Sequence, residues 1–409
     1  MSWKKKFVRN WGRLGMKFNW TTKKLSEIAY INPRESIGKG VVAKKVPMDK
    51  LQPFCRDVPE FVLGEYKGGT KFRNDDTIMA RITPCLENGK IAKVSVLSTD
   101  EIGFGSTEYI VFRAIDGVSD ADFLYYLISS PLVRNLAIKS MVGSSGRQRV
   151  QTDVVANLDI ELPPIEEQRK IGGLLKTFDD KIKLNNEINN NLEQQTQAYF
   201  DELFVVNADP NWPECTLADI GSVVAGGTPS KSKLEYYADQ GIAWITPKDL
   251  SGDKSKFISH GENDISELGF SKSSATKMPA GTILFSSRAP IGYIAIAQNE
   301  VTTNQGFKSV IPNKNIGTAY VYFLLKNLLP TIEGMASGST FKEISGTAMK
   351  SVPTVMPDAD IIQLFSDFCE PVFKEQEVLE AENKHLSALR DSLLPKLMSS
   401  EIDVSELDL

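Results

Sequence analysis

Two glycine- and serine-rich loops carry polar residues of the kinds that contact nucleic acids. Residues 143–150 read GSSGRQRV and residues 337–344 read SGSTFKEI. Backbone N–H groups and hydroxyls bind phosphate oxygens, while Arg and Gln present paired donors to base edges. Solvent-exposed turns often have the same composition, so each loop alone is a weak signal. The first loop supplies Ser144, Ser145, Arg147, Gln148 and Arg149, and the second supplies Ser339, Thr340 and Lys342.

Further hydrogen-bond donors follow strand-like runs in each half of the chain. Residues 76–81 and residues 281–288 both end in an arginine that is followed closely by a proline. Residues 244–249, which read WITPKD, add a threonine and a lysine. Because such loops recur at matched places, we expect both halves to bind DNA. The additional candidate DNA-binding residues are Arg81, Thr83, Asn88, Lys90, Thr246, Lys248 and Arg288.

The sequence lacks the usual motifs of a catalytic or metal site. It contains no G-x-x-x-x-G-K-[ST] loop, no G-x-G-x-x-G after a strand and no H-E-x-x-H helix. The four cysteines have no C-x-x-C spacing, which argues against zinc and fits a reducing cytoplasm. Only two histidines are present. Glu65 and Lys67, with Asp57 upstream, resemble a nuclease set, but E-x-K is common by chance. We expect no catalytic residue and no metal.

Composition limits the class of protein. The 409 residues are enough for two or three domains, and 41% hydrophobic with 24% charged residues is ordinary soluble composition. A net charge of −5 argues against a large nonspecific nucleic-acid binder but allows local basic surfaces. No apolar run approaches the length of a transmembrane helix. Acidic residues concentrate in two predicted helices, where they suit solvent or a protein partner and would repel phosphate.

The longest periodic stretch, residues 177–204, contains no Gly and no Pro and predicts a long helix. Its apolar residues follow a four–three spacing, which is typical of a helix that packs against a partner helix. Thr177 and Asp180 are suited to capping its N-terminus. At 1.5 Å per residue the helix would be roughly 40 Å long. The seam consists of Phe178, Ile182, Asn185, Asn189, Leu192, Thr196, Tyr199 and Leu203.

A second copy of this seam lies 194 residues further along the chain. Two long helices with matched, partly polar seams favour an intramolecular coiled coil, in which polar seam residues fix the register. Two independent surface helices are the alternative. The second seam consists of Val372, Gln376, Leu379, Asn383, Leu386, Arg390, Leu393 and Leu397.

The repeat extends into the globular parts of the chain. Residues 20–28 match residues 212–220, and each segment predicts a strand or turn followed by a short helix. Strands are also predicted at 108–112 and 306–310, and buried helices at 123–127 and 320–324. A period this long indicates gene duplication rather than a solenoid. The expected parts are a basic leader at 1–19, a globular domain at 20–163, a helical spacer at 164–207, a second globular domain at 208–356 and a C-terminal helical spacer at 357–409.

In combination these features resemble the specificity subunit of a type I restriction-modification system. The resemblance covers residues 20–409 and includes the duplicated layout. Its motifs are LPPIEEQRKI at 162–171, GSTFKEI at 338–344 and LLPKLM at 393–398. Ser399 and Ser400 stand where family members commonly carry a glycine. The resemblance implies an α+β fold with two similar mixed α/β target-recognition domains, joined by two long antiparallel coiled-coil helices.

The same resemblance implies a non-catalytic, cytoplasmic DNA-recognition subunit. Each domain would read one half of a bipartite site, while the helices set the spacing and dock two methyltransferase subunits. Motor-nuclease subunits could join, and S-adenosylmethionine, ATP and magnesium would belong to these partners. A self-contained DNA methyltransferase or nuclease is one alternative, against which the absence of a methyl-donor loop argues. A scaffold that does not bind DNA is another, and its loops would tolerate charge reversal.

Overall fold

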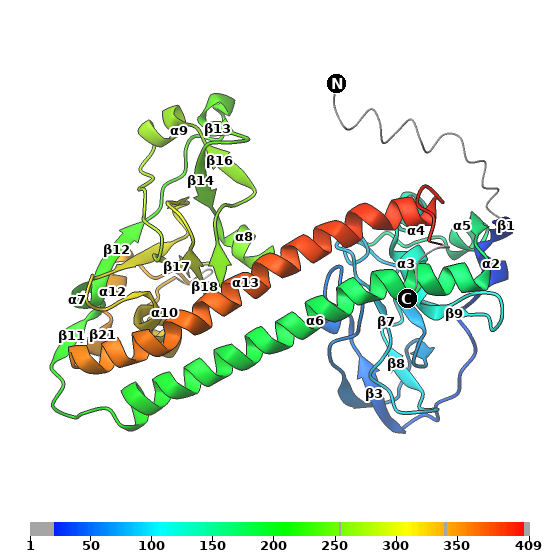
Figure 1. Ribbon diagram of the computed structural model, residues 1–409, viewed down its shortest axis with the longest axis horizontal. Helices are drawn as coiled ribbons and strands as arrows, with labels where there is room; N and C mark the ends of the chain where they lie inside the picture. The colour runs from blue at the N-terminus through cyan, green and yellow to red at the C-terminus, as the bar shows by residue number, and fades with distance from the viewer. Residues whose placement is uncertain (1–19, 145, 253–254, 339–341, 405–409) are drawn as a thin grey trace. The chain divides into compact units, whose positions relative to one another are not determined.

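The computed structural model describes residues 20–144, 146–252, 255–338 and 342–404 (Figure 1). The predicted leader at 1–19 and the candidates Ser145, Ser339 and Thr340 lie outside the described residues. The chain forms two compact units. Unit 1 joins the residues up to Lys183 with those from Lys384 onward, and unit 2 spans Leu184–Asn383. Among the described residues, no helix is long and apolar enough to cross a membrane.

The globular part of unit 1, residues 20–163, is called module 1 below. Its sheets have the orders β1-β10, β2-β9-β6-β7 and β4-β3-β8-β5. The first strand pairs with the last, Thr21 opposite Leu162, so the two ends of the module meet. Its elements are β1 (Thr21–Lys24), α2 (Leu25–Ile28), β2 (Ala29–Ile31), β3 (Val42–Val46), η1 (Met48–Lys50), β4 (Val62–Glu65), β5 (Lys71–Phe72), β6 (Thr77–Ala80), β7 (Ile91–Lys93), β8 (Gly103–Gly105), β9 (Tyr109–Ala114), α3 (Ala121–Ser129), α4 (Pro131–Lys139), α5 (Thr152–Ala156) and β10 (Asp159–Leu162).

The globular part of unit 2, residues 208–356, is called module 2. Its sheets have the orders β11-β21, β12-β20-β17-β18-β15 and β13-β16-β14-β19. Its ends also meet, with Glu214 opposite Val355. Its elements are β11 (Glu214–Thr216), α7 (Leu217–Ile220), β12 (Gly221–Ala225), η3 (Leu234–Tyr236), β13 (Tyr237–Ala238), β14 (Ile242–Ile245), α8 (Pro247–Gly252), β15 (Phe257–Ile258), β16 (Asn263–Ile265), α9 (Glu267–Ser271), β17 (Ile283–Ser287), β18 (Ile291–Ala297), β19 (Thr302–Thr303), β20 (Lys308–Pro312), α10 (Thr318–Asn327), α11 (Leu329–Met335), α12 (Gly346–Lys350) and β21 (Pro353–Val355).

The predicted repeat is confirmed at the level of elements. The two openings, residues 20–28 and 212–220, both form a short strand followed by one helical turn. In module 1, β3 pairs antiparallel with β4 and parallel with β8; in module 2, β14 pairs in the same way with β16 and β19. The buried helices α3 and α10 contribute several of the large aromatic side chains of the two cores. Each half therefore buries its own core around the same plan.

The two long helices are α6 (Ile165–Asp201) and α13 (Ala359–Met398), and a π-helical turn, η2 (Glu202–Val206), extends the first. Their first residues are 194 apart, the same offset as the seams. The predicted start at Thr177 is wrong, because α6 begins directly after Pro163 and Pro164. The Thr177 hydroxyl donates to the Gly173 carbonyl inside the helix at 2.9 Å, so it does not act as an N-cap. At 1.5 Å per residue, α6 is roughly 55 Å long.

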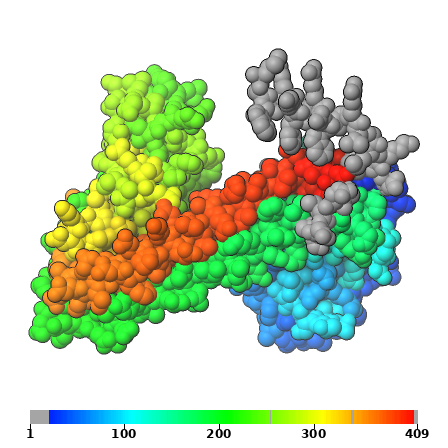
Figure 2. Space-filling model, in the orientation of Figure 1, coloured from blue at the N-terminus to red at the C-terminus, as the bar shows by residue number. Residues whose placement is uncertain are grey.

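The helices run antiparallel in unit 2, where a polar layer joins them. Figure 2 shows the green α6 and the orange to red α13 lying side by side on the surface. The buried Asn185 side chain donates to Glu382 and Asn383 at 2.7 and 2.9 Å. Further along α6, the Tyr199 ring contacts the rings of Phe365 and Phe368. Among the other seam positions, Leu379 and Leu397 are buried, and the following are partly buried: Phe178, Ile182, Asn189, Leu192, Leu203, Val372, Leu386 and Leu393.

Two neighbouring glycines in α6 provide a test of how module 1 packs on the helix. A Cβ at Gly172 would lie 2.7 Å from the backbone nitrogen of Phe123 on α3, whereas a Cβ at Gly173 would meet nothing within 4 Å. We expect Gly172→Ala to destabilise the protein by about 1–3 kcal/mol through overpacking against backbone. Gly173→Ala should stabilise it by about 0.5–1 kcal/mol, because Ala loses less entropy than Gly in a helix. Urea unfolding of both variants measures the difference, and equal effects would contradict the packing described.

Candidate nucleic-acid interface

The first predicted binding loop folds against the loop that follows β6. Arg149 forms antiparallel bridges with both Val142 and Ile82. The Thr83 N–H donates to the Gln148 carbonyl at 3.1 Å, and the Gln148 N–H donates to the Thr83 hydroxyl at 3.0 Å. The structure therefore brings together residues that are about 65 positions apart in the chain. A cis peptide bond between Thr83 and Pro84 shapes the same turn.

One carboxylate that the sequence did not single out lies between the two arginines of this site. Arg149 donates to Glu108 at 2.7 Å and Arg81 does so at 3.1 Å. The hydrogen bond from Arg149 lowers the pKa of Glu108, and Arg81 adds to the effect against the opposing influence of burial. Glu108 thus holds both guanidinium groups in place. The arginines keep N–H groups for a ligand, but their positive charge is partly neutralised.

Module 2 builds the corresponding turn with different residues. Arg288 and Ser337 form antiparallel bridges with Glu343, where module 1 has Arg149. The Ile344 N–H donates to the Ser287 carbonyl at 3.1 Å, as Val150 does to Arg81 at 2.8 Å. Ser287 therefore occupies the position of Arg81, and the two arginines that looked equivalent in sequence are one residue out of step. The Arg288 guanidinium lies 3.4 Å from the Glu343 carboxylate.

The remaining predicted residues are spread over the two modules. The Lys90 ammonium donates to the Met48 carbonyl at 2.8 Å, and Lys248 forms an ion pair with Glu262 at 2.6 Å. The Thr246 hydroxyl and N–H both donate to Asp249, which ties the start of α8. These three side chains therefore make contacts within the protein, in addition to any contact with a ligand. The candidates Asn88, Ser144, Arg147 and Lys342 are exposed.

The structure also brings together two basic loops of module 2 that the sequence reasoning missed. Residues 226–233 read GGTPSKSK, and residues 272–277 read KSSATK. A Cβ at Gly227 would lie only 2.3 Å from the backbone nitrogen of Ala275, so the two backbones touch. Lys231, Lys233 and Lys272 are exposed on this loop pair. The sequence signal that could have identified this loop is its pair of glycines followed by alternating serine and lysine.

Module 1 has exposed lysines on loops beside β3 and β4. The Gly40 N–H donates to the Tyr66 carbonyl at 3.1 Å, and the Tyr66 N–H donates to the Val41 carbonyl at 2.8 Å. These contacts continue the β3–β4 ladder, whereas the contact in module 2 joins the loop after β12 to the loop after α9. Lys39 and Lys67 are exposed here. Both modules thus carry lysines on exposed loops, but through different contacts.

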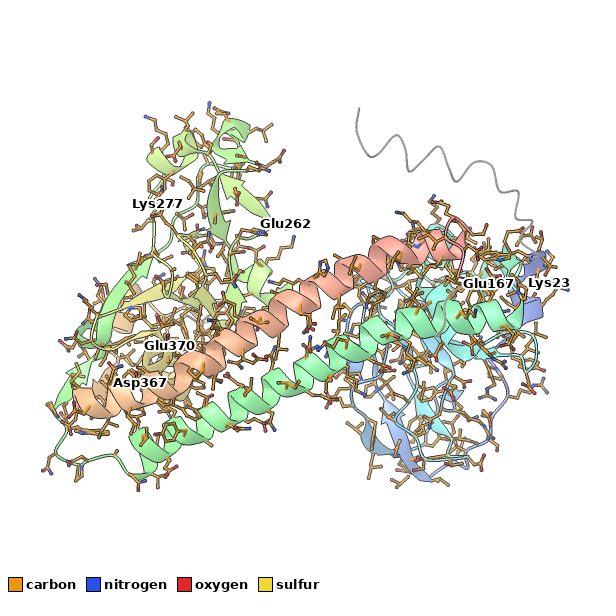
Figure 3. All side chains as sticks on the ribbon, in the orientation of Figure 1. Lys23, Glu167, Glu262, Lys277, Asp367 and Glu370 are labelled. Atoms are coloured by element: carbon orange, nitrogen blue, oxygen red, sulfur yellow. The ribbon has the colours of Figure 1, made fainter. Side chains whose placement is uncertain are left out.

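Acidic side chains gather on a different part of unit 2. Figure 3 shows Asp367 and Glu370 on α13, whereas Lys277 and Glu262 lie at the end of module 2 away from that helix. Lys277 contacts Glu300 at 3.2 Å, so this end is of mixed charge. Within the described part of the chain, no group of three or more His, Cys, Asp or Glu side chains is arranged to hold a metal ion.

Comparison with known proteins identifies the family. The family described as "Type I restriction modification DNA specificity domain" matches residues 18–194 and again residues 210–387. The type I restriction enzyme MjaIX specificity subunit of Methanocaldococcus jannaschii is 38% identical over 193 residues, which span 45% of this chain and 44% of that protein. The HindI specificity subunit of Haemophilus influenzae is 24% identical over 374 residues, covering 73% of this chain and 81% of the relative.

A solved structure has the same fold. The crystal structure of a type I restriction-modification system S subunit from M. genitalium aligns with 94% of this chain and 97% of its own, at 17% identity and a TM-score of 0.56. The two family matches fall one on each half of the internal repeat, together with most of the adjoining long helix. The chain therefore belongs to the type I restriction-modification specificity subunits, which recognise DNA and are not themselves catalytic.

Proposed function

We propose that each module reads one half of a bipartite DNA site. The observation that carries the proposal is the separate match of the DNA specificity family to each half of the chain, together with exposed basic loops in both modules. Lysines and backbone N–H groups in such loops bind phosphates and fix orientation, while side chains in the adjacent arginine turns are suited to base edges. Arg81 and Arg149 are held in place by Glu108, which reduces the entropy lost when they bind.

The long helices suit two further roles in this proposal. Their length lets them set the number of unread base pairs between the half-sites. Their exposed faces carry acidic residues, which would be repelled by DNA and are better suited to docking two methyltransferase subunits. Motor-nuclease subunits could then join the assembly. S-adenosylmethionine, ATP and magnesium would be bound by these partners, and the complex would work in the cytoplasm, where its DNA is.

A salt titration tests the DNA surface. We expect the double variant Lys231→Gln and Lys272→Gln to weaken binding by the assembled complex equally on cognate and unrelated DNA. Each lost phosphate contact should reduce the slope of log affinity against log salt by about 0.9, so two should reduce it by roughly 1.8. The exposed Lys314 and Lys350 of the same module, changed together to Gln, provide the charge-matched control.

A companion variant distinguishes the loop pair from the arginine turn. Arg147→Ala tests the turn of module 1, and a base contact there would cost about 1–3 kcal/mol on the cognate site alone. If the loop-pair variant and its control have identical salt slopes, the loop pair does not contact DNA. Unchanged binding of Arg147→Ala on all sequences would likewise remove that residue from the interface.

The spacing role has its own test. We propose inserting four residues into α6 after Lys183 and four into α13 after Asn383, which adds one turn, about 6 Å, to both helices. Four residues rotate a helix by only about 40°, so the seam is largely preserved. The gap between the methylated half-sites should grow by one or two base pairs, as sequencing of methylated adenines would show.

Two-residue insertions at the same places serve as the control. They rotate the following seam by about 200° and should abolish stable assembly. If the four-residue variant is active and still methylates sites with the original gap, the helices do not set the spacing. Altered half-sites would show instead that base reading depends on the helices.

A further inference from the structure

Each module buries one cation at the same place in the fold. The Arg56 carbonyl accepts a hydrogen bond from the Lys93 N–H at 2.6 Å, and the Lys256 carbonyl accepts one from the Ile296 N–H at 2.7 Å. In both modules the residue after the cation pairs in parallel with that same donor. The Arg56 and Lys256 side chains are equally buried, with 6% and 7% of their surface exposed. A cation so deeply buried requires a counter-charge.

Module 1 supplies this counter-charge from within itself. Arg56 forms ion pairs with Asp57, at 2.7 Å, and with Asp122 on α3. Lys93 reaches the same Asp122 carboxylate at 2.7 Å. Burial acts to raise the pKa of Asp122, but the bond from Lys93 and the charge of Arg56 outweigh it and lower the pKa. Both ion pairs of Arg56 are therefore made with residues of module 1, and its charge also acts on Asp179 of α6.

Module 2 receives its counter-charge from the long helices. Lys256 forms an ion pair with Glu193 on α6 and donates to the Gln376 amide oxygen on α13 at 2.6 Å. The Phe373 ring of α13 lies 4.2 Å from the same ammonium. Lys326 on α10 also pairs with Glu193. The position on α10 that matches Asp122 is Ala319, which carries no charge.

The segment of the long helices under module 1 also differs in charge from the segment under module 2. With the offset of 194, the position equivalent to Glu193 is Ser387. The offset holds in three dimensions, because Tyr126 bonds to Asp179 in unit 1 and the matching residues Phe323 and Phe373 contact each other in unit 2. Asp179 is itself paired with Arg390 of α13. The helix surface under module 1 therefore has Ser387 where unit 2 has Glu193, and its nearby carboxylate, Asp179 at the position of Phe373, is already paired with Arg390.

We propose that the two module–helix surfaces are chemically distinct, so that module 2 can be seated only on a helix segment that provides the Glu193 carboxylate. Seated on the segment of unit 1, module 2 would bury Lys256 opposite Ser387. Module 1 carries its own counter-charge at this position. Seated on the segment of unit 2, it loses the Tyr126 hydrogen bond and has Ser129 in place of Lys326, but Arg56 then lies where Lys256 meets Glu193. Exchange of modules between the two positions is thus permitted in one direction.

Three full-length chains test this rule by calorimetric unfolding. The first carries module 2 in both positions, the second adds Ser387→Glu to it, and the third carries module 1 in both positions. We expect the misplaced module 2 to unfold about 10 °C below its natural counterpart, because an unpaired buried charge is strongly destabilising. Ser387→Glu should recover at least half of this shift. The chain with two copies of module 1 should lose less than half as much.

Matched controls separate this effect from general damage. Ser392→Glu adds the same charge at an exposed position of α13 and should recover nothing. A chain with module 2 in both positions that is as stable as the natural protein would overturn the proposal, as would equal recovery by Ser392→Glu. DNA specificity provides a separate readout, which rests on the proposed function. The chain rescued by Ser387→Glu carries module 2 twice, so it should recognise a DNA site made of the same half-site twice. If this chain folds but recognises no such site, half-site reading is contradicted and the seating rule still holds.

Variants of the natural chain decide the question even if the exchanged chains do not fold. Glu193→Gln should lower the unfolding midpoint of unit 2 by several degrees, since it removes the carboxylate that is paired with Lys256 and leaves only Glu380, which accepts the Lys256 backbone N–H, to offset the charge. Adding Lys256→Met should restore most of the loss. Glu375→Gln, an exposed acid on α13, is the control. If Glu193→Gln is no more destabilising than Glu375→Gln, or if Lys256→Met makes the protein still less stable, the proposal is wrong.

Discussion

The structure depends on the buried ion pairs and hydrogen bonds that join each module to the pair of long helices. In unit 2 the Glu193 carboxylate is shared by Lys256 and Lys326, and in unit 1 Asp179 joins the Tyr126 hydroxyl to Arg390. Buried ion pairs of this kind add little stability over an apolar contact, but breaking one is costly. Their main consequence is orientation: they allow one seating of the module on the helices and penalise others.

The distribution of charge separates the surfaces that the protein offers to different partners. A chain with a net charge of −5 would repel DNA if its charges were evenly spread. Instead, exposed lysines such as Lys231, Lys233 and Lys272 lie on loops of module 2, while Figure 3 shows the acids Asp367 and Glu370 on α13. The arginine turns combine both features, because Glu108 and Glu343 hold the basic side chains beside them. A local basic surface on an acidic protein therefore favours DNA binding only at the loops that carry the basic residues.

Duplication explains why the two halves share a plan, and divergence explains why they are not interchangeable. The same backbone position carries Arg56 in one module and Lys256 in the other, yet the compensating acid lies on different elements. The arginine turn shows the same pattern, with Glu343 where module 1 has Arg149. Because a buried charge and its partner must change together, each half neutralises its buried cation with carboxylates from different elements.

From the sequence alone, the duplication, several strands and the buried helix of each module, and the two long helices could be predicted, because periodicity and repeats are local properties of the chain. The helical spacer was expected from residue 164, directly after the prolines, but the capping role expected for Thr177 is wrong, since its hydroxyl bonds to Gly173 inside α6. The sequence could not predict the pairing of Arg81 and Arg149 through Glu108, the contact between the two lysine loops of module 2, or the equivalence of Arg56 and Lys256. Each of these joins residues that are far apart in the chain, and only the packing of strands and loops decides which charges become neighbours.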